Sequence, residues 1–282
     1  MLSTGTNSGC NISGLFGYCS SLTGTIPNGF LKNVKATSIG DVFSNTKLTG
    51  LIPSDLLEGS SGYITSCAST FNGSLFNGFV NNTWNVSDFS KVTTFERMFM
   101  SSNISQIPSV FCNKTFNVLT NAANMFQSSK IQSVPDGFLS NCPILINVTN
   151  MFSNCIYINS IGLNVLYNCP KINDAYAILY RTTSLNELLK KSFLYNSTKM
   201  VNFKEFARES GITGIEANGL FYRLDASVSN KNFDRSFQKC LSFTGSVPDL
   251  WNLYGSTTSS NLYTFAESIN ISNYSSIPSS WK

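Results

Sequence analysis

Residues 119–141 read LTNAANMFQSSKIQSVPDGFLSN, and this stretch contains every element of the unit from which the chain is built. Its first part carries apolar residues at short intervals and ends on Phe126. Val134-Pro135 follows, with the bulky Phe138 three residues beyond the proline and Asn141 three residues after that. The same order of landmarks recurs along the rest of the chain, which indicates an internal repeat.

The anchor residue equivalent to Phe126 recurs at intervals of 26 to 32 residues. The apolar–Pro step recurs with it, for example at Ile26-Pro27, Ile107-Pro108 and Val247-Pro248. We therefore predict that residues 1–282 form one repeat solenoid of about ten coils, with short strands and short helical turns. The ten anchors are Phe16, Phe43, Phe71, Phe99, Phe126, Phe152, Leu179, Ala207, Phe237 and Ile269.

Each unit is interpreted as three short segments. A short strand ends at the apolar–Pro step, because proline lacks the N–H that a β-ladder needs. The Pro-x-x-Phe-Leu-x-Asn stretch that follows is typical of a single helical turn, in which the Asn tolerates a left-handed ending. One unit cannot bury its apolar face alone, so stacked units must share a core. The anchors are therefore expected to form a core ladder rather than an aromatic platform for a ligand.

Two short motifs recur in these units and are also found in a known superfamily. Phe-x-x-Cys-x-x-apolar is present at residues 16–22, 152–158 and 237–243, and Leu-Thr-Gly-x-Ile-Pro is present at residues 22–27. The chain resembles the leucine-rich-repeat superfamily in these motifs, and within it the BspA-type repeats of surface proteins. The resemblance covers nearly the whole chain, although units six to eight lack the proline. It implies a role in binding or adhesion on a cell or virion surface.

Composition argues against several other functions. Only 12% of the residues are charged and the net charge of +4 is scattered, so no basic stripe for nucleic acid is expected. No apolar run is long enough for membrane insertion. The chain has no histidine, which removes the commonest general base and metal ligand. We therefore predict no enzymatic activity, no cofactor and no metal site.

The eight cysteines follow the repeat rather than a disulfide framework. Cys19, Cys155 and Cys240 each lie three residues after an anchor, and Cys142 and Cys169 share an Asn-Cys-Pro context. No C-x-x-C spacing occurs, and metal sites need such clustering. We expect free thiols that fill small buried slots.

The seventh and eighth units carry the main concentration of charge. Residues 184–187 match a capping box, with Ser184 and Glu187, and predict the start of a short helix. Glutamates are interleaved with the basic residues here, so a solvated face is favoured over a site for an anionic partner. The basic residues are Lys190, Lys191, Lys199, Lys204 and Arg208.

A row of neutral polar residues alternates with the core positions of the expected strands. These side chains should project outward together, and their hydroxyl and amide groups suit a glycan or a protein partner. An ordinary solvated sheet face is an equally good explanation of the same pattern. The residues are Thr23, Thr25, Thr49, Gln132, Ser133, Asn159, Ser160, Thr213, Thr244 and Ser246.

The ends of the solenoid and the thiols together suggest a biological setting. No capping repeat follows Tyr274, Ile277 and Trp281, so we expect another chain of an assembly, or further sequence, to cover that end. Free thiols without a signal peptide favour a phage virion component, such as a fibre or an accessory capsid or tail protein. Such a protein would assemble in the host cytoplasm and recognise a host-surface or virion partner. The alternative is the ligand-binding repeat region of a bacterial surface adhesin.

Overall fold

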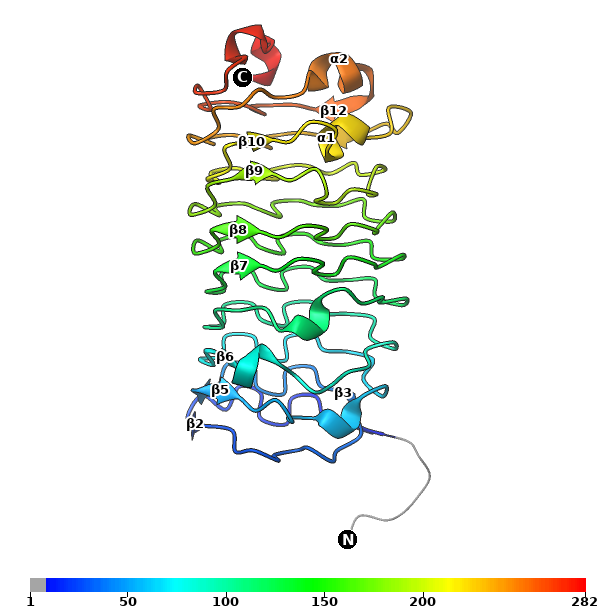
Figure 1. Ribbon diagram of the computed structural model, residues 1–282, viewed down its shortest axis with the longest axis vertical. Helices are drawn as coiled ribbons and strands as arrows, with labels where there is room; N and C mark the ends of the chain where they lie inside the picture. Colours follow the sequence, from blue (N-terminus) through cyan, green and yellow to red (C-terminus); the bar gives the residue numbers. More distant parts are fainter. Residues whose placement is uncertain (1–8) are drawn as a thin grey trace.

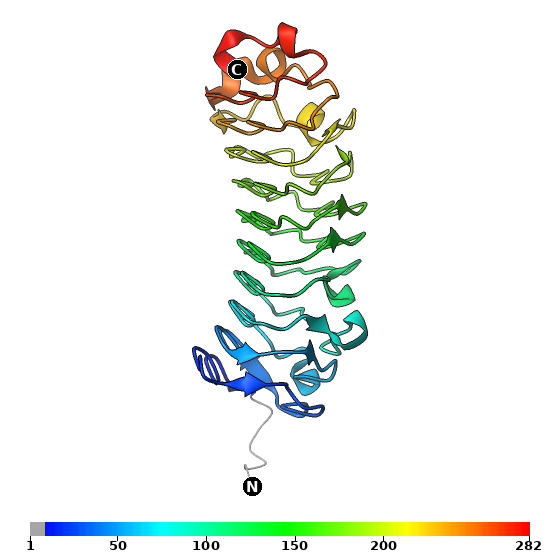
Figure 2. The same ribbon diagram turned by 90° about the vertical axis from the view of Figure 1, so that its left-hand side faces the viewer.

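The computed structural model describes residues 9–282, and these residues form a β-solenoid of about nine turns. The coils stack along the long axis, with the two ends of the chain at opposite ends of the stack (Figure 1). The view turned by 90° shows the same coils edge-on as a regular series of flattened loops (Figure 2). The predicted repeat solenoid is confirmed at this level.

The named strands are two or three residues long, and they pair in parallel between neighbouring coils. This follows from the repeat, because each coil returns the chain to the same position one layer further on. The pairs are β1 (Cys10–Asn11) with β3 (Ala36–Ser38), β2 (Thr23–Gly24) with β4 (Lys47–Leu48), β5 (Leu51–Ile52) with β6 (Gly78–Phe79), β7 (Ser133–Val134) with β8 (Ser160–Ile161), β9 (Leu188–Leu189) with β10 (Gly214–Ile215), and β11 (Lys231–Asn232) with β12 (Thr258–Ser260).

Helical structure in the described residues is confined to short turns. The α-helices are α1 (Leu220–Arg223) and α2 (Leu250–Tyr254), both in the C-terminal coils. The 3₁₀ turns are η1 (Glu58–Ser60), η2 (Val80–Asn82), η3 (Ser109–Phe111), η4 (Gly255–Thr257), η5 (Tyr274–Ser276) and η6 (Ser279–Trp281).

One ladder of polar residues runs through all the coils and accounts for much of the Asn, Ser and Thr content. In most coils the side-chain oxygen accepts a hydrogen bond from the backbone N–H two residues later, as Asn121 does from Ala123 and Asn147 does from Thr149, each at 3.0 Å. These side chains therefore satisfy backbone donors at a tight turn. The rungs are Asn11, Ser38, Ser66, Thr94, Asn121, Asn147, Asp174, Asn202, Asn232 and Ser260.

The anchor phenylalanines form the centre of the core. Phe126 is fully buried, and its ring stacks on Phe99 at 5.3 Å and on Phe152 at 6.0 Å. Similar stacking continues towards the N-terminus as far as Phe16. Leu179 and Ala207 interrupt the stack but are buried at the same position. The prediction of a buried core ladder is confirmed for the eight anchors from Phe43 to Phe237, while Phe16 is half-buried and packs against the end of the column.

The tenth anchor is Phe265, and the prediction of Ile269 was wrong. Phe265 is fully buried and stacks on Phe237 at 5.6 Å, whereas Ile269 is 68% exposed. The backbone agrees, because residues two before and two after each anchor have positive φ, and in the last coil these are Tyr263 and Glu267. The last coil therefore keeps the 28-residue spacing from Phe237.

The expected left-handed ending of the helical turn lies on a different residue from the one predicted. Asn141 and Asn168 do not have positive φ, and the left-handed residue is the leucine two positions earlier, Leu139 (φ 43°) or Leu166 (φ 53°). The prediction of a left-handed Asn holds only for Asn113, with φ 53°. The turn therefore does not use Asn141 and Asn168 at its left-handed position.

The C-terminal end covers its own core. Ile277 and Trp281 are 2% and 3% exposed, and the Trp281 ring lies 5.6 Å from Phe233 and 6.4 Å from Trp251. The Trp281 carbonyl also accepts the N–H of Phe265 at 2.9 Å. The expectation that Ile277 and Trp281 remain open for contact with another chain was wrong, because both side chains are packed inside this one. Tyr274 is half-buried, and assembly at this end stays a prediction.

Candidate functional site

The ten polar residues predicted to face outward lie at the surface of the solenoid. Eight are exposed, while Ser160 and Thr213 are half-buried. Ladder hydrogen bonds bring them into register, because the N–H of Asn159 donates to the carbonyl of Gln132 at 2.9 Å and that of Thr244 to Thr213 at 3.1 Å. The row runs Thr23, Thr25, Thr49, Gln132, Ser133, Asn159, Ser160, Thr213, Thr244 and Ser246.

This row is not continuous along the solenoid. Leu51 and Leu188, on strands of the same ladder, are 49% and 45% exposed and interrupt the polar surface. Near the N-terminal end, Thr23 and Thr25 border an apolar recess of about 270 Å³ that Phe16 and Phe30 also line. The row therefore offers a polar central segment around Gln132 and Asn159 rather than one uniform face.

Coils that lack the proline keep their shape through added hydrogen bonds. Gly162 occupies the proline position after β8, and its N–H donates to the Val134 carbonyl at 2.7 Å. Glu216, at the same position after β10, donates its N–H to the Leu189 carbonyl at 3.0 Å. A residue other than proline has a backbone N–H at this position, and a carbonyl of the preceding coil accepts it. The coils therefore stack here as they do where the proline is present.

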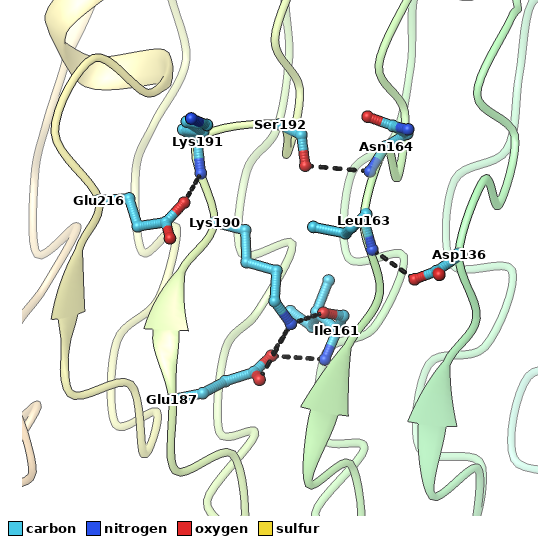
Figure 3. Close-up of polar contacts among 9 residues, drawn as sticks. All are labelled: Asp136, Ile161, Leu163, Asn164, Glu187, Lys190, Lys191, Ser192 and Glu216. Carbon is cyan, nitrogen blue, oxygen red and sulfur yellow. Dashed lines mark hydrogen bonds and ion pairs between the residues drawn. The ribbon is translucent and has the colours of Figure 1, made fainter.

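The charged side chains in these coils bind backbone groups of their neighbours (Figure 3). The Glu187 carboxylate accepts the N–H of Ile161 at 2.6 Å and forms an ion pair with Lys190 at 3.1 Å. Lys190 also donates to the Ile161 carbonyl. Residues 184–187 do not start a helix, so the capping-box prediction was wrong: the Glu187 side chain reaches the preceding coil instead of its own backbone.

Two further carboxylates, Asp136 and Glu216, also accept a backbone N–H of a neighbouring coil. Asp136 accepts the N–H of Leu163 at 2.6 Å, and Glu216 accepts that of Lys191 at 2.6 Å (Figure 3). Each carboxylate links two successive coils through a charge-assisted hydrogen bond. These acidic groups therefore have structural partners.

A ladder of side-chain amides crosses four successive coils. Asn141 donates from Nδ2 to Thr115 Oγ1 at 2.6 Å, Asn168 to Asn141 Oδ1 at 2.8 Å, and Asn196 to Asn168 Oδ1 at 3.2 Å. Parallel backbone bridges join Thr115, Asn141 and Asn168 in the same order. The amides are thus fixed at the spacing of the coils.

Two tyrosines flank the amide ladder. Tyr167 and Tyr195 stack in parallel with their centroids 4.9 Å apart and an interplanar angle of 3°. The Arg223 guanidinium lies 4.0 Å from the Tyr195 centroid, on the next coil. Tyr167 lines an open groove of about 630 Å³ together with the amides. Its lining is Asn113, Ser140, Asn141, Asn164, Tyr167, Asn168 and Asn196.

Sequence reasoning did not identify this groove. The sequence indicates the asparagine of the Pro-x-x-Phe-Leu-x-Asn segment, such as Asn141, as a repeat landmark, but the role predicted for it is in the turn. The spacing of 28 residues between Tyr167 and Tyr195 equals one coil, and it is the signal that could have revealed the stack.

The eight cysteines are unpaired, as expected. Cys155 and Cys240 are buried and donate to carbonyls of the preceding coil at 2.9 Å, which confirms the slot predicted for them. Burial raises the pKa of each of these two thiols to about 12. Cys10 and Cys19 are exposed, so the prediction of a buried slot was wrong for Cys19.

Within residues 9–282, potential metal-ligating side chains are scattered and the helices are short. No group of three or more His, Cys, Asp or Glu side chains within this part of the chain is arranged to hold a metal ion. No helix among the same residues has the length and apolarity to cross a membrane.

Comparison of the chain with protein-family models, with curated proteins and with solved structures finds no match. The geometry described above therefore provides the basis for a functional proposal.

Proposed function

We propose that this chain is a non-catalytic recognition module that presents one lateral side of a rigid solenoid to a glycan or protein on a cell or virion surface. The observation that carries the proposal is the set of regularly spaced, neutral polar side chains on that side. The amide ladder of Asn141, Asn168 and Asn196 and the exposed row around Gln132 repeat at coil spacing. Rigid repeats that display one side chain per layer are suited to extended partners.

The polar chemistry of the solenoid supports a binding role over catalysis. Asp136, Glu187 and Glu216 accept backbone N–H groups, which suits a structural use of these carboxylates. The sequence also contains no histidine to act as a base at neutral pH.

The setting that we propose is a phage virion, in a fibre or an accessory capsid or tail protein. The supporting observation is that the cysteines are unpaired, since a virion protein assembles in reducing cytoplasm. A relationship to BspA-type leucine-rich repeats belongs to the same proposal. Its support is that Cys155 and Cys240 of the Phe-x-x-Cys motif occupy one equivalent buried slot.

Co-sedimentation tests the recognition role. The fluorescently labelled chain is titrated onto intact bacterial cells and onto purified phage particles, and saturable binding to one of them is expected. Periodate treatment of the target removes a glycan partner, and protease treatment removes a protein partner. Absence of saturable binding to both targets would refute the proposed function.

A further inference from the structure

We infer that the groove of Asn141, Tyr167, Asn168 and Asn196 binds a linear, neutral oligosaccharide along the solenoid axis. The inference rests on the proposed recognition function and specifies both the surface and the class of ligand. Three features of the groove carry it: the unused hydrogen-bonding capacity of the amides, a tyrosine stack that a further ring can continue, and an uncharged lining.

The amide ladder leaves a donor and an acceptor available on its middle members. A carboxamide has two N–H donors and two acceptor lone pairs. In Asn141 and Asn168, one N–H donates along the ladder and one lone pair accepts along it. One N–H and one lone pair therefore remain on each residue, one coil apart. A donor and an acceptor on one small group match the adjacent hydroxyls of a sugar.

The tyrosine stack ends at Tyr167, which lines the groove. Arg223 covers one side of Tyr195, and Tyr195 covers one side of Tyr167. The backbone N–H of Asn168 donates to the carbonyl of Ser140 at 2.8 Å, which places Ser140 in register with Tyr167 one coil earlier.

Ser140 and Tyr167 both line the groove, and a serine side chain is too short to stack on the ring. We therefore expect a further ring to continue the stack at the level of Ser140. A pyranose ring can occupy that level with its C–H face on the tyrosine, since the amides lie beside it. Aromatic side chains combine such apolar contact with a polar rim in many binding sites.

The composition of the groove favours a neutral ligand. The residues that line it are uncharged, since they are five asparagines, one serine and one tyrosine. The nearby Arg223 guanidinium is stacked on Tyr195. Stacked aromatics with amides can also bind the bases of single-stranded RNA. RNA binding needs a positively charged track for the phosphates, and the residues that line the groove include no lysine or arginine. A neutral glycan is therefore favoured over RNA.

Calorimetric titration of the whole chain tests the inference. The probes are cellotetraose, maltotetraose and chitotetraose, with tetragalacturonate and a hexauridine RNA as charged comparisons. At least one neutral tetrasaccharide is expected to bind with a Kd below about 1 mM. Failure of all three neutral probes to bind, or binding of the charged probes alone, would overturn the inference.

Two variants on the same coil locate the site. Ser140→Tyr places a ring where the stack on Tyr167 would continue and should weaken binding more than about tenfold. Ser133→Tyr adds the same side chain to the exposed polar row and reports whether the tetrasaccharide binds there instead, while Ser20→Tyr, at an exposed position on the first coil, should leave the Kd unchanged. Circular dichroism confirms that these variants are folded, and Tyr167→Phe, which keeps the stacking ring, should bind nearly as well as the original chain.

The outcomes separate this inference from the proposed function. If Ser133→Tyr weakens tetrasaccharide binding and Ser140→Tyr does not, the ligand lies on the polar row and the groove assignment is wrong. If no neutral tetrasaccharide binds but the chain still sediments with cells or phage particles, recognition stands and this inference fails.

Discussion

Replacing Phe126 by alanine should strongly destabilise the solenoid, because this ring is the centre of the aromatic column. It is fully buried, stacks on Phe99 and Phe152, and contacts Phe138 edge-on at 5.8 Å. Removing a buried phenylalanine costs about 3–5 kcal/mol. Three ring contacts, each worth about 0.5–1.5 kcal/mol beyond area burial, place the loss towards the upper part of that range.

Urea unfolding measured by circular dichroism and by tryptophan fluorescence provides the assay. With a slope of about 3 kcal/mol/M, a loss of about 3–5 kcal/mol lowers the midpoint by about 1–1.7 M. Thr244→Ala is the matched control, because Thr244 is exposed and its loss should cost less than about 0.5 kcal/mol. Coincident curves from the two probes would show that one unfolding event is being measured.

The comparison of Phe126→Ala with Thr244→Ala can refute the assignment of the inward and outward faces. Equal midpoint shifts would mean that the anchor column does not carry the core. A large loss for Thr244→Ala alone would mean that the two faces are interchanged.

Three further predictions follow from particular positions. Phe265→Ala should lower the urea midpoint clearly while Ile269→Ala changes it by less than about 0.2 M, and the opposite order would restore Ile269 as the tenth anchor. Native labelling with a thiol reagent near pH 8 should modify Cys10 and Cys19 quickly and the buried thiols only after denaturation, since burial blocks access to them and raises the pKa of Cys67, Cys155 and Cys240; eight fast labels would contradict the packing. Ser101→Gly should raise the free energy of unfolding by up to about 1 kcal/mol, because Ser101 has φ 54°, and a lower midpoint would argue against that backbone conformation.

The repeat could be predicted from the sequence because its core positions are large and its period is nearly constant. Phe99, Phe126 and Phe152 recur at 27 and 26 residues, and nothing else in the chain competes for that pattern. The last anchor was missed for a physical reason. Thirteen residues separate Phe265 from Pro278, against nine between Phe126 and Pro135, because the last coil contains extra residues before its proline. Counting back nine residues from Pro278, as from Pro135 to Phe126, therefore gives Ile269, which is exposed.

The candidate groove was harder to predict, because asparagine has two uses in this chain. Asn121 and Asn147 each accept a backbone N–H at a turn, and such capping occurs in enough coils to explain any asparagine in phase with the repeat. Asn141 and Asn168 share that phase but use their side chains between coils. Only the contacts of the amide groups distinguish the two cases.

The C-terminal end illustrates how one motif can serve two purposes. In inner coils the apolar–Pro–x–x–bulky segment lies between two neighbours, as Phe138 does when it contacts both Phe126 and Phe152. In the last coil the same segment ends in Trp281, which contacts Phe233 and Trp251. The two serines before Trp281, Ser279 and Ser280, are exposed. The motif alone could not predict that Trp281 packs inside this chain, because its inward-facing residues are of the same kind in the inner coils and in the last one.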